Sequence, residues 1–250
     1  MDVIQTVYTY ANKNTRGRYE IGKSLFGLPL YAFEVKKTAY PKVIVIGGMH
    51  AREYITCYLT MYLAQDFIKR GKRGTVYFIP MLNPDGIRKV VDGDSLYKAN
   101  GRGVDLNVNF DAGWGEGEKN VRVSGPENFI GDKPFSEPET AALRDFTLKL
   151  SPDATLSFHS KGQEIYYGFR GKRESDRILA EKIAEKSGYV VKPTPNSAGG
   201  YKDWCVDKLC IPSFTVEVGD DALSHPITKE SLKSVIYENA QDIIILTENL

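Results

Sequence analysis

The sequence predicts a single α/β domain with a mostly parallel or mixed central sheet flanked by helices. Three observations support this fold class. Apolar, β-branched runs typical of buried strands recur along the chain, segments with apolar residues at helical spacing separate them, and turn residues bound both kinds of segment. Such alternation is typical of a mostly parallel or mixed sheet. The 250 residues and 42% apolar content suffice for a large core, so we expect one domain over residues 1–250.

The N-terminal part supplies the first strands and a long helix. A helix is expected over residues 2–14, because its apolar residues recur at helical spacing. Two short strands are expected within residues 19–36, on either side of a glycine-proline turn. The run VIVI at 43–46 predicts a buried strand, and residues 53–72 predict an amphipathic helix that packs on the sheet.

The middle of the chain changes from regular to irregular pattern. Residues 76–81 predict another buried strand, which the turn sequence NPDG at 83–86 is expected to end. A polar segment over about 92–133 has no regular period. Large apolar residues are scattered through it, which favours an ordered, functional loop over disorder.

The second half alternates helices and strands. The sequence SEPE at 136–139 is a capping box with proline in the first turn, so a helix is expected to start there. The expected elements are helices at 136–150, 173–187, 199–209 and 227–248, and strands at 154–158, 164–169, 189–192 and 213–218.

Charge and composition exclude several classes of partner. The 33 basic and 32 acidic residues give a net charge of +1, without the runs of like charge used to bind nucleic acid or anionic lipid. No apolar stretch approaches 18 residues, and no signal-peptide pattern opens the chain, although a chain that had lost its signal would look the same. Only three cysteines occur, which fits a reducing compartment. We expect a cytoplasmic protein; the sequence does not indicate its oligomeric state.

Two of the three histidines follow predicted buried strands. His50 comes after the strand at 43–46, with Glu53 three residues later, and His159 ends the strand at 154–158. The carboxyl ends of parallel strands share one edge of a sheet, so the three side chains are expected to meet. Two imidazoles and a carboxylate would leave a fourth position open on a catalytic zinc ion. Either histidine alone is equally well a structural residue, and cobalt or manganese also accepts such ligands.

A carboxylate in an apolar strand is the candidate base. Glu217 lies among apolar neighbours in the strand at 213–218. Partial desolvation would raise its pKa towards a value useful for general base catalysis. The alternative is an ordinary ion pair with a lysine, which spacing alone favours.

Five ordered motifs resemble the zinc carboxypeptidase family. They are HARE at 50–53, NPDG at 83–86, RGVDLN at 102–107, SFHS at 157–160 and FTVE at 214–217. Their order and spacing match over roughly residues 21–218, and five together are far more specific than any one. The resemblance implies a single α/β domain with a mixed sheet of about eight strands.

The resemblance also implies roles for individual residues. His50, Glu53 and His159 would bind one zinc ion, and Glu217 would activate water and pass its proton to the leaving amine. Lys98 falls where the family has an arginine that stabilises the oxyanion; lysine supplies the charge without the planar fork. A solvated loop lysine is the other interpretation of that position.

Four further positions are expected to contact substrate. Arg52 matches a family arginine that contacts substrate, and Asn107 matches a residue that binds the terminal carboxylate. Ser160 belongs to the second histidine motif. Tyr201 lies just beyond a Gly-Gly pair and is expected to line the pocket, although a role in starting a helix is equally compatible with its position.

Two departures from the family bear on the substrate. The family follows the asparagine with an arginine that clamps the terminal α-carboxylate, and here Val108 stands in its place. Pro195 occupies the position of the family tyrosine that closes over the substrate.

The segment YKANGRGVDLN at 97–107 is similar to the branch of the family that cleaves γ-D-glutamyl-diamino acid bonds in bacterial cell-wall peptides. The resemblance therefore implies a small peptide or muropeptide substrate, cut between γ-D-Glu and diaminopimelate. Two alternatives stay open. One is an ordinary carboxypeptidase that removes C-terminal amino acids, and the other is an inactive relative that binds peptides.

Overall fold

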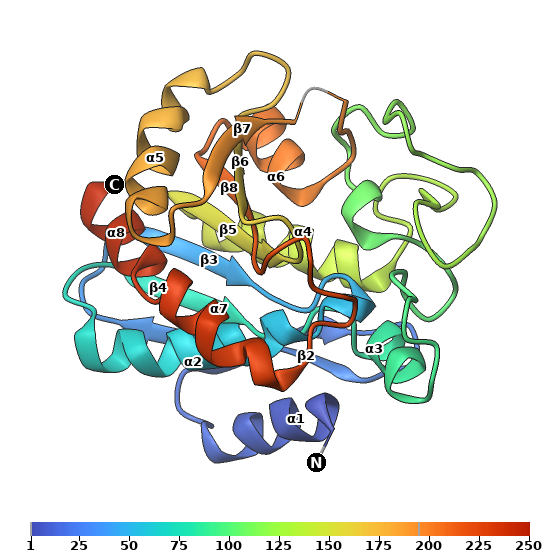
Figure 1. Cartoon of the computed structure of the whole chain (residues 1–250), viewed down its shortest axis with the longest axis horizontal. Helices are drawn as coiled ribbons and strands as arrows, with labels where there is room; N and C mark the ends of the chain where they lie inside the picture. The colour runs from blue at the N-terminus through green and yellow to red at the C-terminus, as the bar shows by residue number, and fades with distance from the viewer. Residues whose placement is uncertain (1, 195) are drawn as a thin grey trace.

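An eight-stranded mixed sheet forms the centre of the computed structural model, which describes residues 2–194 and 196–250 (Figure 1). The strand order is β1-β2-β4-β3-β5-β8-β6-β7. The strands are β1 (Arg18–Lys23), β2 (Pro29–Lys36), β3 (Lys42–Ile46), β4 (Thr75–Ile79), β5 (Ala154–His159), β6 (Glu164–Tyr167), β7 (Val190–Pro193) and β8 (Ser213–Glu217). The predicted fold class is confirmed.

Three adjacent parallel strands carry the residues singled out by the sequence. β3 pairs with β5, and β5 pairs with β8, both in parallel. Their carboxyl ends therefore share one edge, and His159 lies directly opposite Glu217 in the register. β6 turns back antiparallel along β8, and β7 runs parallel to β6 at the sheet's edge.

Helices cover both faces of the sheet. They are α1 (Val3–Lys13), α2 (Ile55–Arg70), α3 (Pro84–Val91), α4 (Pro138–Leu150), α5 (Arg177–Ser187), α6 (Tyr201–Trp204), α7 (Leu232–Asn239) and α8 (Asp242–Asn249). Because side chains alternate along a strand, Val43 and Val45 of β3 join one core and Ile44 and Ile46 join the other. α2, α5, α7 and α8 cover the first core, and α4 and α6 cover the second.

The segment NPDG differs from its prediction, because it starts a helix as well as ending a strand. The Asn83 side chain accepts a hydrogen bond from Gly86 N–H at 2.9 Å, and Pro84 takes the first helical position of α3. Asparagine caps helices and opens turns by the same side-chain bond, so the sequence alone did not separate the two.

Two other helices depart from the pattern. The expected helix at 227–248 starts only at Leu232 and is divided into α7 and α8 by turn residues at 240–241. The capping box at 136–139 does not form. Glu137 is the N-cap without a side-chain cap bond, and the Ser136 hydroxyl donates to its carboxylate at 2.6 Å instead.

The long segment between α3 and α4 is ordered by backbone bonds, as its scattered apolar residues indicated. It lies beside the turn that follows β3, where Ala51 N–H donates to Lys98 O at 2.9 Å. This contact brings the loop to the carboxyl edge of the central strands. In the described part of the chain, no helix is long and apolar enough to cross a membrane.

Candidate metal centre and active site

The turn after β3 presents His50 and Glu53 on the same side. Gly48 has φ +60°, and a Cβ atom there would lie 2.5 Å from Cys57 Sγ, so glycine permits the close packing of this turn on α2. A 3₁₀ turn, Ala51–Glu53, follows directly. It places His50 Nδ1 3.0 Å from Glu53 Oε1.

His159 completes a compact group of three buried side chains. It ends β5, the parallel neighbour of β3, and its Nδ1 lies 3.0 Å from both His50 Nδ1 and Glu53 Oε2. One ligand atom from each residue lies within 4.8 Å of the others. All three residues are at most 5% exposed. The structure thus brings together the three residues that the sequence assigned to metal.

The donor atoms of this group fit a divalent cation. His50 Nε2 lies 3.1 Å from a carboxylate oxygen of Asp105, which only accepts, so in neutral His50 the proton is on Nε2 and Nδ1 carries a lone pair. That lone pair faces the Glu53 carboxylate. Zinc bonds of about 2.0–2.2 Å require ligand atoms roughly 3 Å apart, as found here.

Asp105 joins the group, although the sequence reasoning gave it no role of its own. Its carboxylate, fully buried, contacts His50 Nε2 and lies 2.8 Å from Lys98 Nζ. Burial alone would raise its pKa, but the charges of Lys98 and His50 outweigh that effect and hold the pKa well below its usual value. A carboxylate behind a ligand histidine fixes its tautomer and orientation. Asp105 was nevertheless visible in the motif RGVDLN, between Lys98 and Asn107, the two residues of this loop that were assigned roles.

Glu217 faces the metal group from the end of β8. Desolvation by the surrounding protein, followed by the negative charge of Glu53, raises the pKa of Glu217 to about 8. A cation held between these carboxylates would oppose the charge of Glu53 and lower that pKa. The group is therefore suited to take up and release a proton near neutral pH.

Lys98 lies at the same cavity, fixed by Asp105. Burial would lower the pKa of Lys98, but the carboxylates of Asp105 and Glu53 outweigh it and raise the pKa, so the side chain is a cation at neutral pH. Its position beside the metal group suits stabilisation of a developing oxyanion.

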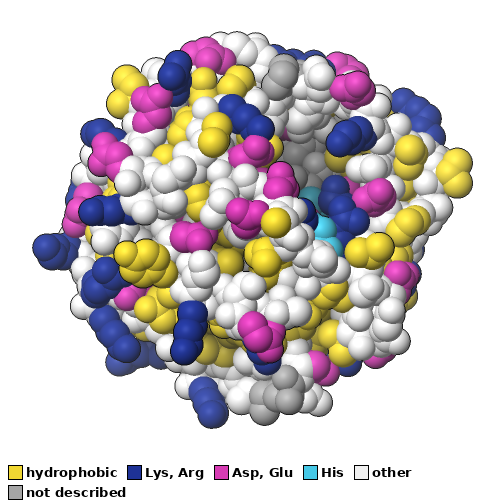
Figure 2. Space-filling view, in the orientation of Figure 1, with side chains coloured by type: hydrophobic (Ala, Val, Ile, Leu, Met, Phe, Trp, Pro, Cys, Tyr) yellow, Lys and Arg dark blue, Asp and Glu magenta, His cyan; other side chains and the backbone are white. Residues whose placement is uncertain are grey.

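A cavity of about 640 Å³ opens beside these groups. His50, Lys98, Asn107, Val108 and Glu217 are among its lining residues. Figure 2 shows a hollow on this face, with histidine at its floor and basic side chains beside it. Asn107 Oδ1 accepts the backbone N–H of Tyr201 at 3.1 Å, which leaves its amide nitrogen to donate to a ligand.

The other residues expected to contact substrate, Arg52, Ser160 and Tyr201, are not among the residues that line the cavity. Arg52 Nη1 is held by Leu96 O and Glu127 at 3.1 and 3.2 Å, and Ser160 donates its backbone N–H to Glu53 at 3.2 Å. Neither lines the large cavity. Tyr201 does not line it either, which corrects the expectation that it does: its ring is 1% exposed, packs in the core, and bonds through its hydroxyl to Thr147. Pro195 lies outside the described residues.

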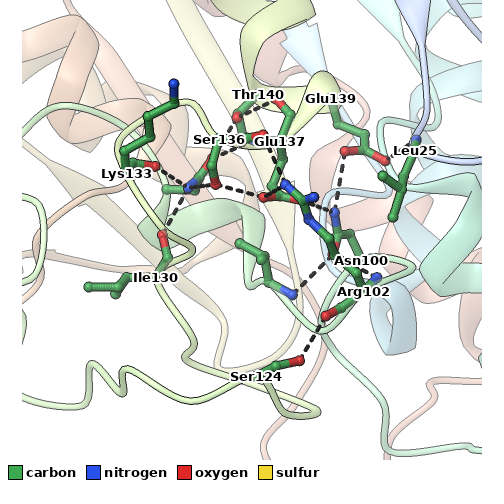
Figure 3. Close-up of polar contacts among 12 residues, drawn as sticks. Leu25, Asn100, Arg102, Ser124, Ile130, Lys133, Ser136, Glu137, Glu139 and Thr140 are labelled. Carbon is green, nitrogen blue, oxygen red and sulfur yellow. Dashed lines mark hydrogen bonds and ion pairs between the residues drawn. The ribbon is translucent and has the colours of Figure 1, made fainter.

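A buried polar network holds the loop that carries Lys98, Asp105 and Asn107 (Figure 3). Asn100 Nδ2 donates to Glu137 at 2.7 Å and lies 3.4 Å from Glu139, while its oxygen accepts the Val104 N–H at 3.0 Å.

An Arg102–Glu137 ion pair and a second asparagine also attach the loop to α4. Arg102 donates twice to the Glu137 carboxylate, at 2.8 and 2.7 Å. On the other side of Asp105, Asn109 Oδ1 accepts a hydrogen bond from the Thr140 hydroxyl at 2.7 Å. Asn100 and Asn109 thus tie the loop to the start of α4 on either side of Asp105, which fixes this part of the loop against the metal group.

Comparison with known proteins agrees with this geometry. The model of the family described as zinc carboxypeptidase matches residues 8–241. The chain belongs to the zinc carboxypeptidase family. Its relatives include peptidases and a peptidoglycan-peptide amidase, which indicates that this zinc carboxypeptidase relative is a hydrolase, and zinc is the metal that the family implies.

Three relatives illustrate its place. It is 28% identical to γ-D-glutamyl-L-diamino acid endopeptidase 1 of Lysinibacillus sphaericus over 97% of this chain and 68% of that one. The murein-tripeptide amidase MpaA of Escherichia coli O157 is 27% identical, with a TM-score of 0.67 over 92% of each chain. Bovine thrombin-activatable fibrinolysis inhibitor, 22% identical, shares the fold with a TM-score of 0.88 over 98% of this chain and 96% of that one. The chain spans 68% and 64% of the length of the first two curated relatives that it matches.

Proposed function

We propose that this zinc carboxypeptidase relative hydrolyses the amide bond between γ-D-Glu and diaminopimelate in cell-wall peptides. His50, Glu53 and His159 hold one zinc ion, Glu217 is the base, and Lys98 is the oxyanion cation. Arg52, Asn107 and Ser160 are proposed to contact the substrate. The relative from L. sphaericus is named for this class of bond, which supports the choice of substrate.

Val108 is the observation that carries the proposal. It lines the cavity next to Asn107, where the carboxypeptidases that this chain resembles have an arginine that clamps a free α-carboxylate. Without the guanidinium of that arginine, the cavity lacks the charge-assisted hydrogen bonds that bind the α-carboxylate of an ordinary C-terminal residue. Its lining includes the lysines 98, 119 and 192 beside Glu118 and Glu217, so cations are available to a leaving residue that carries a second carboxylate.

Each residue of the site has a separate proposed role in the reaction. A bound zinc ion supplies Lewis acidity toward the scissile carbonyl and toward water. Glu217, at the cavity wall, accepts the proton of the attacking water and returns it to the leaving amine. Lys98 offsets the charge that develops on the carbonyl oxygen, while Asp105 keeps both Lys98 and His50 in place. Asn107 orients the leaving residue by its amide nitrogen.

The test compares two substrate classes with zinc-loaded protein. One substrate is the tripeptide L-Ala-γ-D-Glu-meso-diaminopimelate, and the others are N-blocked dipeptides that end in a free L-amino acid. We expect kcat/KM for the tripeptide to be higher by about tenfold or more, the value of one lost charge-assisted contact. Equal or better cleavage of the dipeptides would instead make the protein an ordinary carboxypeptidase.

A matched variant tests whether the protein is a catalyst. Glu217→Gln keeps the shape of the side chain and removes the base. We expect it to bind the tripeptide without cleaving it, whereas wild type releases free diaminopimelate. If wild type and variant behave alike on every substrate while both bind zinc, the protein is a peptide-binding relative rather than an enzyme.

A further inference from the structure

The last two strands of the sheet, β6 and the edge strand β7, bring a lysine and a glutamate beside the cavity. In the register, Glu164 of β6 lies opposite Glu217 of β8, and Tyr166 of β6 lies opposite Lys192 of β7. Residues opposite each other across neighbouring strands project to the same face. Tyr166 and Lys192 accordingly line the same cavity as Glu217.

Lys192 and Glu164 form an open ion pair on this face. Lys192 Nζ contacts the Glu164 carboxylate, and the Tyr166 hydroxyl donates to the same carboxylate. The side chains of Lys192 and Glu164 are 44% and 20% exposed. An ion pair this open contributes little to folding and rearranges readily around a ligand. Its chemistry is therefore available for binding.

Lys192 differs from the other two lysines of the cavity, Lys98 and Lys119, in its surroundings. Lys98 is committed to Asp105, beside the metal group, and Lys119 is exposed. Lys192 lines the cavity and pairs with Glu164, whose partly exposed carboxylate lies directly behind the lining residues Lys192 and Tyr166. A cation alone selects an anion, but a cation and an anion side by side complement a group that carries both charges.

We propose that Lys192 and Glu164 bind an amino-acid head at the far end of the leaving residue, the carboxylate at Lys192 and the ammonium at Glu164. This inference rests on the proposed function. Diaminopimelate carries such a head, whereas lysine carries only the ammonium there. The pair thus makes the enzyme select diaminopimelate over lysine.

The distances across the sheet permit this contact. β7 lies two strands from β8, which is roughly 10 Å at the usual strand spacing. The two α-carbons of diaminopimelate are separated by four bonds, or roughly 5 Å when extended. The Lys192 side chain covers the remaining distance from its strand toward the cavity.

The experiment uses two tripeptides, L-Ala-γ-D-Glu-meso-diaminopimelate and L-Ala-γ-D-Glu-L-Lys, which differ by one carboxylate. Wild type is compared with Lys192→Met. The control is Lys172→Met, because Lys172 also forms a half-exposed ion pair, with Asp207 at 2.6 Å, but does not line the cavity.

Wild type is expected to favour the diaminopimelate tripeptide by about tenfold or more in kcat/KM, mainly through KM, as one charge-assisted contact predicts. Lys192→Met should reduce this ratio to about threefold or less by losing activity on the diaminopimelate tripeptide alone. Lys172→Met should keep the wild-type ratio.

Binding to the Glu217→Gln variant gives a second readout that needs no turnover. Calorimetry is expected to show tighter binding of the diaminopimelate tripeptide, and loss of that preference when Lys192→Met is added. Equal treatment of the two tripeptides by wild type, or equal losses in Lys192→Met and Lys172→Met, would overturn the inference. If the proposed function fails, neither tripeptide is cleaved. In that case the calorimetric preference between the two tripeptides still decides whether Lys192 and Glu164 bind the amino-acid head.

Discussion

Asp105→Asn tests the electrostatic core of the site, because one oxygen of this carboxylate holds the metal-binding His50 and the other holds Lys98, at 3.1 and 2.8 Å. The variant keeps the shape but replaces one acceptor with an amide nitrogen. Whichever way the amide lies, that nitrogen faces a donor, either the His50 Nε2–H or the Lys98 ammonium. The substitution therefore removes a charge and creates one repulsive contact.

The magnitude follows from the contact to His50. A hydrogen bond to a charged group contributes about 1.5–3 kcal/mol, and about 1.4 kcal/mol corresponds to tenfold in affinity. We expect zinc affinity to fall about 10–100-fold, as is typical when a partner behind a ligand histidine is removed. Lys98 also loses its anion, so kcat should fall even at saturating zinc.

Competition with a chromophoric chelator measures the zinc affinity, and tripeptide hydrolysis at saturating zinc measures kcat. Asp207→Asn is the control, since Asp207 pairs with lysines 172 and 208 away from the cavity. Unchanged zinc affinity and unchanged kcat in Asp105→Asn, beside an unchanged control, would refute the role given to Asp105.

Three further predictions concern single groups. Zinc binding at pH 7 should release about one proton fewer in Glu217→Gln than in wild type, because a carboxyl group with a pKa of about 8 is mostly protonated until the cation arrives; calorimetry in buffers of different ionisation enthalpy counts the protons, and equal release would contradict the prediction. Burial raises the pKa of Glu139 to about 7, above its usual value of 4.5, so the folded protein holds this proton more tightly than the unfolded chain does. The folded state is therefore favoured at low pH, and that advantage is lost as the pH rises from the unfolded pKa through the folded one. Urea unfolding should show that wild type loses about 2–3 kcal/mol more between pH 5 and 8 than Glu139→Gln does, and parallel pH profiles would count against this. Val108→Arg should raise kcat/KM on N-blocked dipeptides by about tenfold or more, and no gain would mean that the missing arginine does not set the substrate.

The residues nearest the metal were accessible to sequence reasoning because their strands are buried on both faces. β3 is a continuous apolar run after Lys42, and β5 and β8 combine apolar residues with serine and threonine. His50 follows β3, and His159 and Glu217 are the last residues of β5 and β8, so all three fall at the same sheet edge. His50, His159 and Glu217 were placed by that rule and by the family resemblance together. The segment NPDG was less tractable, because the same Asn83 bond ends a strand and begins α3.

The substrate side depended on register, which the sequence does not encode locally. Lys192 lies on a four-residue edge strand, and only its pairing with Tyr166 brings it to the cavity. Tyr201 was expected at the pocket from its distance to the Gly-Gly pair. Instead its ring fills the second core against Phe110 and Trp204, where burial of a large aromatic surface outweighs exposure to a ligand.

Product identification by mass spectrometry tests the central claim most directly. Zinc-loaded protein is incubated with L-Ala-γ-D-Glu-meso-diaminopimelate, and the fragments are weighed. The proposed function predicts two products, the dipeptide L-Ala-D-Glu and free diaminopimelate, with neither formed by Glu217→Gln. Release of free alanine, or an intact tripeptide beside rapid trimming of ordinary C-terminal residues, would contradict it.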